Sequence, residues 1–398
     1  MSEHSFVPEV ERFDRAAAGP LPQRLLIGGI VGIVGSLIGA VISREHFAYS
    51  WLFAFSYFFS LCVGCLFWTC LHHATDAEWS VVVRRQLENA ASLIPYLFFF
   101  FIPVMFCFDI LYKWWSVAPG VDPLLDAKQP YLSRPFFLIR VAIYFVALSW
   151  VAWSLRRNST EQDVDGEGRR SFTMRKFGIG GIPVVALCIT FAAFDWLMGL
   201  DYHWFSTMWG VYIFAGAAGS SMSLLVLIVT ALKHQGYLKV VNEEHYHIMG
   251  KFLLAFTVFW AYIGFSQYML IWYANMPEET SYYIVRNTGN WWWLSTLLVV
   301  GRFFLPFGIL LTQWIKKTPK YLKYVAMWIL FMQLVDVFVI VLPFARKTGF
   351  GFFDVILSLF ALAGIGGILG WLFFGKLSQS NLFPTRDPRL CASLKLTN

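Results

Sequence analysis

Charged residues are scarce in this chain of 398 residues. Asp, Glu, Lys and Arg make up 14% of it, whereas soluble domains hold about a quarter. Hydrophobic residues reach 58%, and the mean hydropathy is +0.59. Aromatic residues reach 19%, which suits lipid-facing surfaces and interfacial belts. The composition excludes a soluble protein and predicts a polytopic membrane protein, so the formal net charge of +7 does not indicate a nucleic-acid partner.

Motifs for bound cofactors are also missing from the sequence. The six cysteines form no four-cysteine cluster for an iron–sulfur centre, and Cys62-x-x-Cys65 lacks the following histidine of a haem attachment motif. No P-loop or Rossmann fingerprint is present. The eight histidines lie in predicted loops or at helix ends, which excludes a haem held between two membrane helices. We therefore expect no redox cofactor, metal or catalytic group on this chain.

Ten apolar runs are long enough to cross a bilayer, which takes about 20 residues at 1.5 Å rise each. The predicted spans are 25–43, 49–72, 90–113, 135–155, 177–199, 205–232, 248–273, 291–314, 321–344 and 351–376. We therefore expect an all-α polytopic membrane protein whose ten-helix membrane domain covers 25–376. Polar segments flank this domain at 1–24 and 377–398.

Lysine and arginine gather in alternate connecting segments, which indicates orientation through the positive-inside rule. The clearest cluster comprises Arg156, Arg157, Arg169, Arg170, Arg175 and Lys176. Arg346 and Lys347, between spans nine and ten, run against the trend. The first 24 residues hold four acidic side chains before any apolar run, unlike a signal peptide. We expect both termini in the cytoplasm.

Glycines mark the first span as a helix suited to close packing. Gly28, Gly32, Gly35 and Gly39 follow spacings of four, three and four, which predicts a small-residue stripe on one helix face. Whether this stripe meets another helix of the chain or a neighbouring subunit stays open. The polar segment 156–176 is expected to be a flexible connection.

Spans two to five and six to nine share the same order of directions, and their ionisable residues correspond. Arg140 and Arg302 lie in the third span of each group, and Asp195 and Asp336 lie in the fourth. This correspondence predicts two four-helix bundles, related as parallel repeats are in other membrane proteins and flanked by spans one and ten. The predicted bundles cover about 49–199 and 205–344.

The two intramembrane carboxylates need a physical reason, because a carboxylate in the bilayer core costs roughly 3 kcal/mol on insertion scales. Arg140 and Arg302 are the obvious partners for Asp195 and Asp336, since an ion pair avoids an isolated charge. One interpretation is that each pair only locks its bundle. The other is that the carboxylates belong to a proton path, and both interpretations stay open here.

Ionisable residues near the ends of the spans are further candidates for this path. His72 closes the second span and Glu88 precedes the third, so these two are expected to form the cytoplasmic mouth of a half-channel that ends at Asp195. Asp109 is a candidate near the outer end of the third span, although a lysine four residues on favours a local ion pair. Asp354, at the start of span ten, is expected to face water.

Two long strings carry a family resemblance. FDWLMGLDYHWFSTMWG begins at Phe194, and the stretch 245–280 ends in YMLIWYANMPEET, with GNWWW following at the start of the eighth span. These strings resemble the ten-helix membrane subunits of bacterial alternative complex III, within the polysulfide-reductase membrane-subunit (NrfD-like) family. The resemblance covers essentially the whole chain and is closest to the smaller of the two such subunits, the F subunit.

This resemblance implies a cofactor-free subunit of a quinol oxidoreductase in the bacterial inner membrane, which anchors the complex and provides part of a proton path. Electrons would pass to a cytochrome c or directly to a terminal oxidase. Quinol, haem c and iron–sulfur clusters would belong to partners: a sister ten-helix quinol subunit, a multi-haem cytochrome c and an iron–sulfur subunit. Intramembrane acids and helix-end histidines are the family's proposed proton groups, which carries over to Asp195, Asp336, His72 and Glu88.

Two other functions stay open at this point. The chain itself could bind the quinol, for which Asp109, Arg140 and Asp195 would have to converge in one pocket on the outer side. Alternatively, it could be a stand-alone secondary transporter, although such folds carry helices interrupted by Gly or Pro at matching positions in both halves. Co-purification with haem c and iron–sulfur proteins would separate a complex subunit from a transporter.

Overall fold

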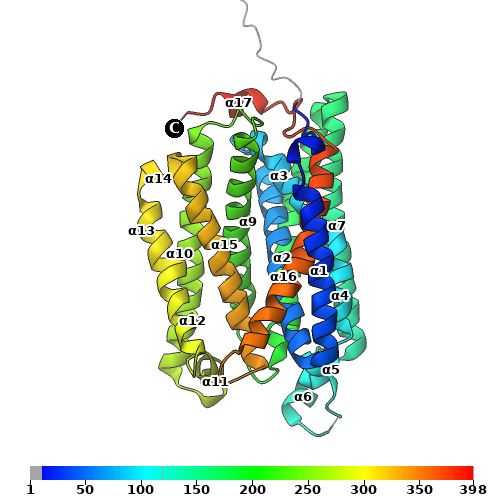
Figure 1. Cartoon of the computed structure of the whole chain (residues 1–398), viewed down its shortest axis with the longest axis vertical. Coiled ribbons are helices and arrows are strands. Elements are labelled where there is room, and N and C mark those ends of the chain that lie inside the picture. Colours follow the sequence, from blue (N-terminus) through cyan, green and yellow to red (C-terminus); the bar gives the residue numbers. More distant parts are fainter. Residues whose placement is uncertain (1–10, 119, 398) are drawn as a thin grey trace, which may run out of the picture.

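The computed structural model describes residues 11–118 and 120–397, where regular structure is helical apart from one isolated bridge between Arg12 and Asn381. Ten helical segments in these ranges are long and apolar enough to cross a membrane (Figure 1). The expected all-α polytopic membrane protein is therefore confirmed. The helices that build these segments are α1 (Leu21–Ile42), α2 (Arg44–Ala74), α3 (Val81–Ala91) with α4 (Ile94–Met105), α7 (Arg134–Asp165), α8 (Gly168–Trp196), α9 (Trp209–His234), α10 (Glu243–Ala274), α12 (Trp291–Leu297) with η4 (Leu298–Phe304) and α13 (Leu305–Leu311), α15 (Pro319–Val341) and α16 (Phe352–Ser378).

Shorter helices lie at the two ends of the molecule. One end, which we call the terminal end, carries Glu11 and the C-terminal tail 379–397. A hydrogen bond from Leu382 N to Glu11 O at 2.8 Å joins these two segments. The distal end, opposite to it, carries α6 and α11 (Figure 1). The short elements are η1 (Arg15–Ala18), α5 (Phe108–Leu111), η2 (Lys113–Trp115), α6 (Pro123–Lys128), η3 (Met198–Leu200), α11 (Pro277–Arg286), α14 (Gln313–Lys317), η5 (Leu342–Phe344) and α17 (Leu390–Leu394).

Contacts between helices follow the two groups expected from the repeat. In the first group, α2 packs against α3, α4 and α8, while α7 packs against α4 and α8. In the second group, α9 packs against α10 and α15, and η4 also packs against α10 and α15. The groups meet where α9 lies against α2 and α8. Figure 1 shows the first group in blue through cyan to green, and the second group in green through yellow to orange.

Small residues let the two groups approach closely. A Cβ on Gly64 of α2 would lie 2.3 Å from the carbonyl oxygen of Ala217 on α9, so only glycine fits there. The neighbouring Trp68 indole donates to the carbonyl of Ala218 at 2.9 Å. Close backbone approach between small residues is the usual way in which membrane helices gain packing energy.

The glycine stripe of α1 docks within the same chain. Gly29, Gly32 and Gly39 are buried, and a Cβ on Gly32 would lie 2.3 Å from the backbone nitrogen of Gly364 on α16. Gly28 was expected on this face but is exposed, and a Cβ added there would meet no atom within 4 Å. Three of the four predicted glycines, Gly32, Gly35 and Gly39, thus pack against α16, and Gly29 takes the place of Gly28.

The segment 156–176 is helical, which corrects the expectation of a flexible connection. The 32 residues of α7 span about 48 Å, longer than the hydrocarbon core of about 30 Å, and α8 begins three residues after α7 ends. Gly166 caps α7 in the left-handed conformation with φ +70°. The ion pair of Arg157 with Glu161 on successive turns supports the polar end of α7.

The third span also lies elsewhere than predicted. It covers Val81–Met105 instead of 90–113, and a short break at Ser92 and Leu93 separates α3 from α4. The shift arises because every residue of α3 is buried, including its charged ones. Arg84 and Arg85 pair with Glu88 within α3, and also with Asp387 and Asp163 outside it. A hydropathy count assigns a segment with such charged side chains to a loop, because it does not register that they are buried.

We predict that Gly32→Leu destabilises the membrane domain whereas Gly28→Leu does not. The leucine at position 32 would collide with the backbone of α16, and overpacking of this kind costs about 1–3 kcal/mol or more. The free energy of unfolding in detergent would measure the difference. Equal stability of the two variants would contradict the packing of α1 on α16.

Candidate functional site

A buried ion pair joins α7 to α8 near the distal end. Arg140 Nε donates to Asp195 Oδ2 at 2.8 Å, and its second terminal nitrogen donates to Oδ1 at 2.8 Å. The carboxylate is 1% exposed and the arginine 6%. Two parallel hydrogen bonds are the strongest arrangement for this pair of groups. The expected pairing of Arg140 with Asp195 is confirmed.

Aromatic groups complete the surroundings of this pair. The Tyr144 hydroxyl donates to Asp195 Oδ2 at 2.7 Å, one turn along α7 from Arg140. The guanidinium lies 3.9 Å from the ring centroid of Tyr131, and another of its nitrogens donates to the Tyr131 carbonyl at 2.8 Å. Cation–π contacts strengthen when they are shielded from water. Asp195 therefore accepts three hydrogen bonds, two from the charged Arg140 guanidinium and one from the neutral Tyr144 hydroxyl.

A second buried pair lies in the second bundle. Arg302 of η4 forms an ion pair with Asp336 of α15 and hydrogen-bonds Gln333, and its guanidinium lies 4.0 Å from the ring centroid of Trp260. The Tyr212 hydroxyl donates to Asp336 Oδ1 at 2.6 Å. Arg302 sits in a π-helical stretch, which occurs often at functional sites. The expected pairing of Arg302 with Asp336 is confirmed.

The two ion pairs have the same arrangement of side chains, which the sequence predicted only in part. In each, an arginine and a tyrosine hydroxyl hold a carboxylate. Tyr144 comes from the helix of its arginine, whereas Tyr212 comes from α9, a different helix from Arg302. Sequence reasoning missed both tyrosines. The spacing of four residues between Arg140 and Tyr144 places them on one helix face and could have indicated the first.

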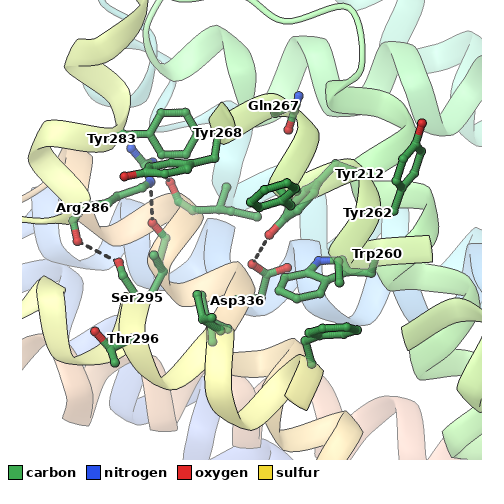
Figure 2. A pocket seen from close by; sticks show the side chains of 18 of the residues that line it. Tyr212, Trp260, Tyr262, Gln267, Tyr268, Tyr283, Arg286, Ser295, Thr296 and Asp336 are labelled. Carbon is green, nitrogen blue, oxygen red and sulfur yellow. Dashed lines mark hydrogen bonds between the residues drawn. The ribbon is translucent and has the colours of Figure 1, made fainter. Parts of the chain in front are cut away.

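A large pocket opens beside the second pair, as Figure 2 shows. Its volume is about 710 Å³, and Asp336 and Tyr212 form part of its wall. Nine further aromatic side chains from α9, α10, α11 and η4 line it, together with aliphatic and polar residues. The nine are Trp209, Trp260, Tyr262, Phe265, Tyr268, Tyr282, Tyr283, Phe303 and Phe304.

The alternative quinol site expected from sequence does not form. Asp109 pairs with Arg44 at 2.8 Å, not with the lysine four residues on, and both side chains are about half exposed. Arg140 and Asp195 are buried elsewhere, and none of the three lines the pocket in the second bundle. Helix α5 ends at Leu111, before that lysine, so the i,i+4 spacing is not helical there.

Asp354 is likewise buried, not water-facing. It is 1% exposed, lies 3.3 Å from His46 Nε2 and accepts a hydrogen bond from the Gly351 backbone at 2.8 Å. The carboxylate closes the start of α16, as an acid at a helix N-terminus does. Its role here is structural.

At the terminal end, Glu88 joins a buried network of charges. Arg84 lies 3.1 Å and Arg85 3.2 Å from its carboxylate oxygens, and His73 Nε2 lies 3.8 Å away. The histidine that lies beside Glu88 is thus His73. The ring of His72 packs on Trp79 at 5.0 Å, and neither of its nitrogens has a hydrogen-bond partner.

The C-terminal tail closes this network. Asp387 accepts from Arg84 at 2.8 Å and from Arg389 at 2.9 Å, and Gln86 donates to the Leu382 carbonyl at 2.8 Å. Burial by itself would raise the pKa of the Asp387 carboxyl, but the two arginines outweigh burial and hold its pKa well below the usual value. The tail is therefore fastened to α3 by a carboxylate that stays charged.

The network of Glu88 and the pair of Asp195 lie at different depths. A Cβ on Gly178 of α8 would lie 3.0 Å from the Cβ of His73, so these two residues lie at the same height along the helix axes. From Gly178 to Asp195 the helix rises about 25 Å over 17 residues. The structure brings His73 and Glu88 together, and Arg140 and Asp195 together, but not the two groups.

Comparison of the chain with known proteins adds no further assignment. No protein-family model matches the sequence, and no curated protein matches it significantly. The function of the chain is therefore inferred from the geometry above and from the resemblance of the two strings.

We predict that Asp195→Leu costs about 3–5 kcal/mol of folding free energy, because it leaves a buried arginine unpaired. Adding Arg140→Met should recover much of this loss, since an apolar pair replaces the ion pair without a free charge. Asp109→Leu, alone or with Arg44→Met, is the matched control at an exposed pair and should cost at most about 1 kcal/mol. Denaturant unfolding in detergent measures all four; an equal cost of both single Leu variants would contradict the buried pair.

We also predict that the tail stays docked on acidification from pH 7 to pH 5. A carboxyl whose pKa is lowered by folding stabilises the folded state above its unfolded pKa of about 3.9, and loses that contribution only as the pH falls through the folded value. Asp387→Asn should free the tail at every pH. Hydrogen exchange of residues 380–395, corrected for pH, is the readout; undocking of the unchanged tail by pH 5 would refute the assignment.

Proposed function

We propose that this chain is a membrane subunit of a quinol-oxidising respiratory complex of the alternative complex III type. It anchors the assembly in the bacterial inner membrane and provides part of a proton path, without a redox cofactor of its own. The observation that carries the proposal is the duplicated buried site, in which Arg140 holds Asp195 and Arg302 holds Asp336, each with a tyrosine hydroxyl on the carboxylate.

The duplicated site suits proton transfer because each buried carboxylate lies in direct contact with an arginine and with a tyrosine hydroxyl. Carboxylates inside the membrane commonly mark ion pathways. The tyrosine hydroxyl supplies a second hydrogen-bonding group through which a proton could pass.

Charge also supports an orientation and a set of partners. Arg156 and Arg157 of α7 lie at the terminal end together with the basic residues of α8 and α14, so this end would face the cytoplasm. The distal end would then meet the multi-haem cytochrome c and iron–sulfur subunits. A sister ten-helix quinol subunit and lipid would cover the sides, and the complex would deliver electrons to a cytochrome c or a terminal oxidase.

We predict that Asp195→Asn and Asp336→Asn lower proton release per quinol oxidised by about tenfold or more, since proton transfer needs a group that titrates. Asparagine keeps the shape and one accepting oxygen but leaves the arginine without a counter-charge, so assembly of the complex is measured in parallel. Proton release from vesicles that contain the purified complex is the measurement.

Asp109→Asn is the matched control for this experiment, because it removes a carboxylate at an exposed ion pair. If both buried variants assemble fully and their proton release is unchanged, the two ion pairs have only a structural role. Purification of the native chain is the broader test: a chain that never carries haem c and iron–sulfur proteins with it is not a subunit of this complex.

A further inference from the structure

A cluster of lysines lies at the terminal end of the second bundle, on two helices that pack together. Lys316 and Lys317 belong to α14, and Lys251 lies in the third turn of α10. Figure 1 shows α14 at this end, and it packs against α10 and α15. Helix α14 begins two residues after the span that ends at Leu311, so the cluster lies where a membrane helix meets the headgroup region.

Lys316 is buried without a counter-charge. It is 7% exposed, although lysine is almost never fully buried unless it is paired. Its stem packs on Gly250 of α10, where a Cβ would lie 2.7 Å from Lys316 Cγ, so the glycine makes room for it. Among the ion pairs and hydrogen bonds within residues 11–118 and 120–397, Lys317 has Glu244 as its partner, whereas the Lys316 ammonium group has none.

A second lysine adds to the positive charge at this place. Lys251 directly follows Gly250, is exposed, and forms no ion pair with the part of the chain that the structure describes. Burial first, and the charge of Lys251 second, lower the pKa of the Lys316 ammonium group. The Glu244 carboxylate is already shared between Lys317 and His247, the latter at 3.3 Å. An anion beside Lys251 and Lys316 would therefore stabilise both charges.

The surroundings of the lysines indicate an anion that belongs to the membrane. Trp314 of α14 is 58% exposed, and its ring centroid lies 4.7 Å from that of Tyr321, which is also exposed. Tryptophan and tyrosine gather at the level of the lipid headgroups. Leu305 and Leu311 of α13 are exposed as well and continue the surface along the span. A soluble phosphate would gain nothing from these apolar groups, whereas a lipid would contact them.

We propose that this surface binds the phosphate of an anionic phospholipid at Lys251 and Lys316, with its glycerol beside Trp314 and its acyl chains along α13. Lysine binds phosphate as a point charge, and basic pockets between membrane helices hold anionic headgroups in other proteins. The site goes beyond the proposed function and does not depend on it, because a stand-alone membrane protein with this surface would bind the same lipid.

The test uses the purified chain in detergent after removal of bound lipid. Dioleoyl phosphatidylglycerol or dioleoyl phosphatidylcholine is then added, and native mass spectrometry measures how much of each binds. Phosphatidylglycerol should bind more tightly, since the site lacks a negative partner. Lys316→Met keeps an unbranched stem and removes the charge, so it should weaken binding of phosphatidylglycerol by about fivefold or more and leave phosphatidylcholine unchanged.

Lys176→Met is the matched control. Lys176 is exposed on the polar part of α8, lies 4.6 Å from the Phe172 ring centroid and belongs to the first bundle. Its replacement should leave binding of phosphatidylglycerol unchanged. Inorganic phosphate at the same concentration should not displace the lipid, because it lacks the contacts to α13.

Thermal unfolding distinguishes lost binding from a damaged fold. Without lipid, Lys316→Met should be at least as stable as the unchanged protein, because it removes a buried charge that has no partner. Phosphatidylglycerol should raise the unfolding midpoint of the unchanged protein more than that of Lys316→Met. The proposal is overturned if both lysine variants bind phosphatidylglycerol equally, if phosphatidylcholine binds as tightly, or if inorganic phosphate displaces the lipid.

Discussion

A carboxylate inside a bilayer must be held by a cation, and this constraint organises both halves of the molecule. Asp195 and Asp336 each tie the fourth helix of a bundle to an arginine on the third. The cost of an unpaired charge in hydrocarbon makes the two helices of each pair dependent on each other. The tyrosine hydroxyls then orient the carboxylates. The same contacts that hold the bundles thus create groups with the chemistry to carry a proton.

Charge compensation also explains the terminal end. Arg84 and Arg85 share Glu88, and they pair further with Asp387 of the tail and Asp163 of α7. A buried network of this kind is tolerable only when its members are nearly all paired. His72 and His73 lie at its edge. The proposed proton path therefore has polar groups at two depths, separated by about 25 Å along α8.

Sequence reasoning succeeded where the signal is local. Hydropathy located ten spans, and the scarcity of intramembrane charge singled out both Arg–Asp pairs correctly. It was wrong for Asp354, which was expected to face water but is buried, because burial of a charged residue depends on neighbours that are distant in sequence. The glycine stripe was recognised, and Gly28 is the one of its four residues that does not pack against α16.

By itself, the sequence determined the class of the protein, its spans and the partners of its intramembrane acids, because the bilayer penalises each exposed polar group strongly and locally. Only the tertiary structure decided that α1 docks on α16 and that His73, not His72, meets Glu88. It also decided where a pocket opens: beside Asp336, among aromatic rings from four helical elements. Such a cavity is a property of packing between distant segments, for which single residues carry no signal.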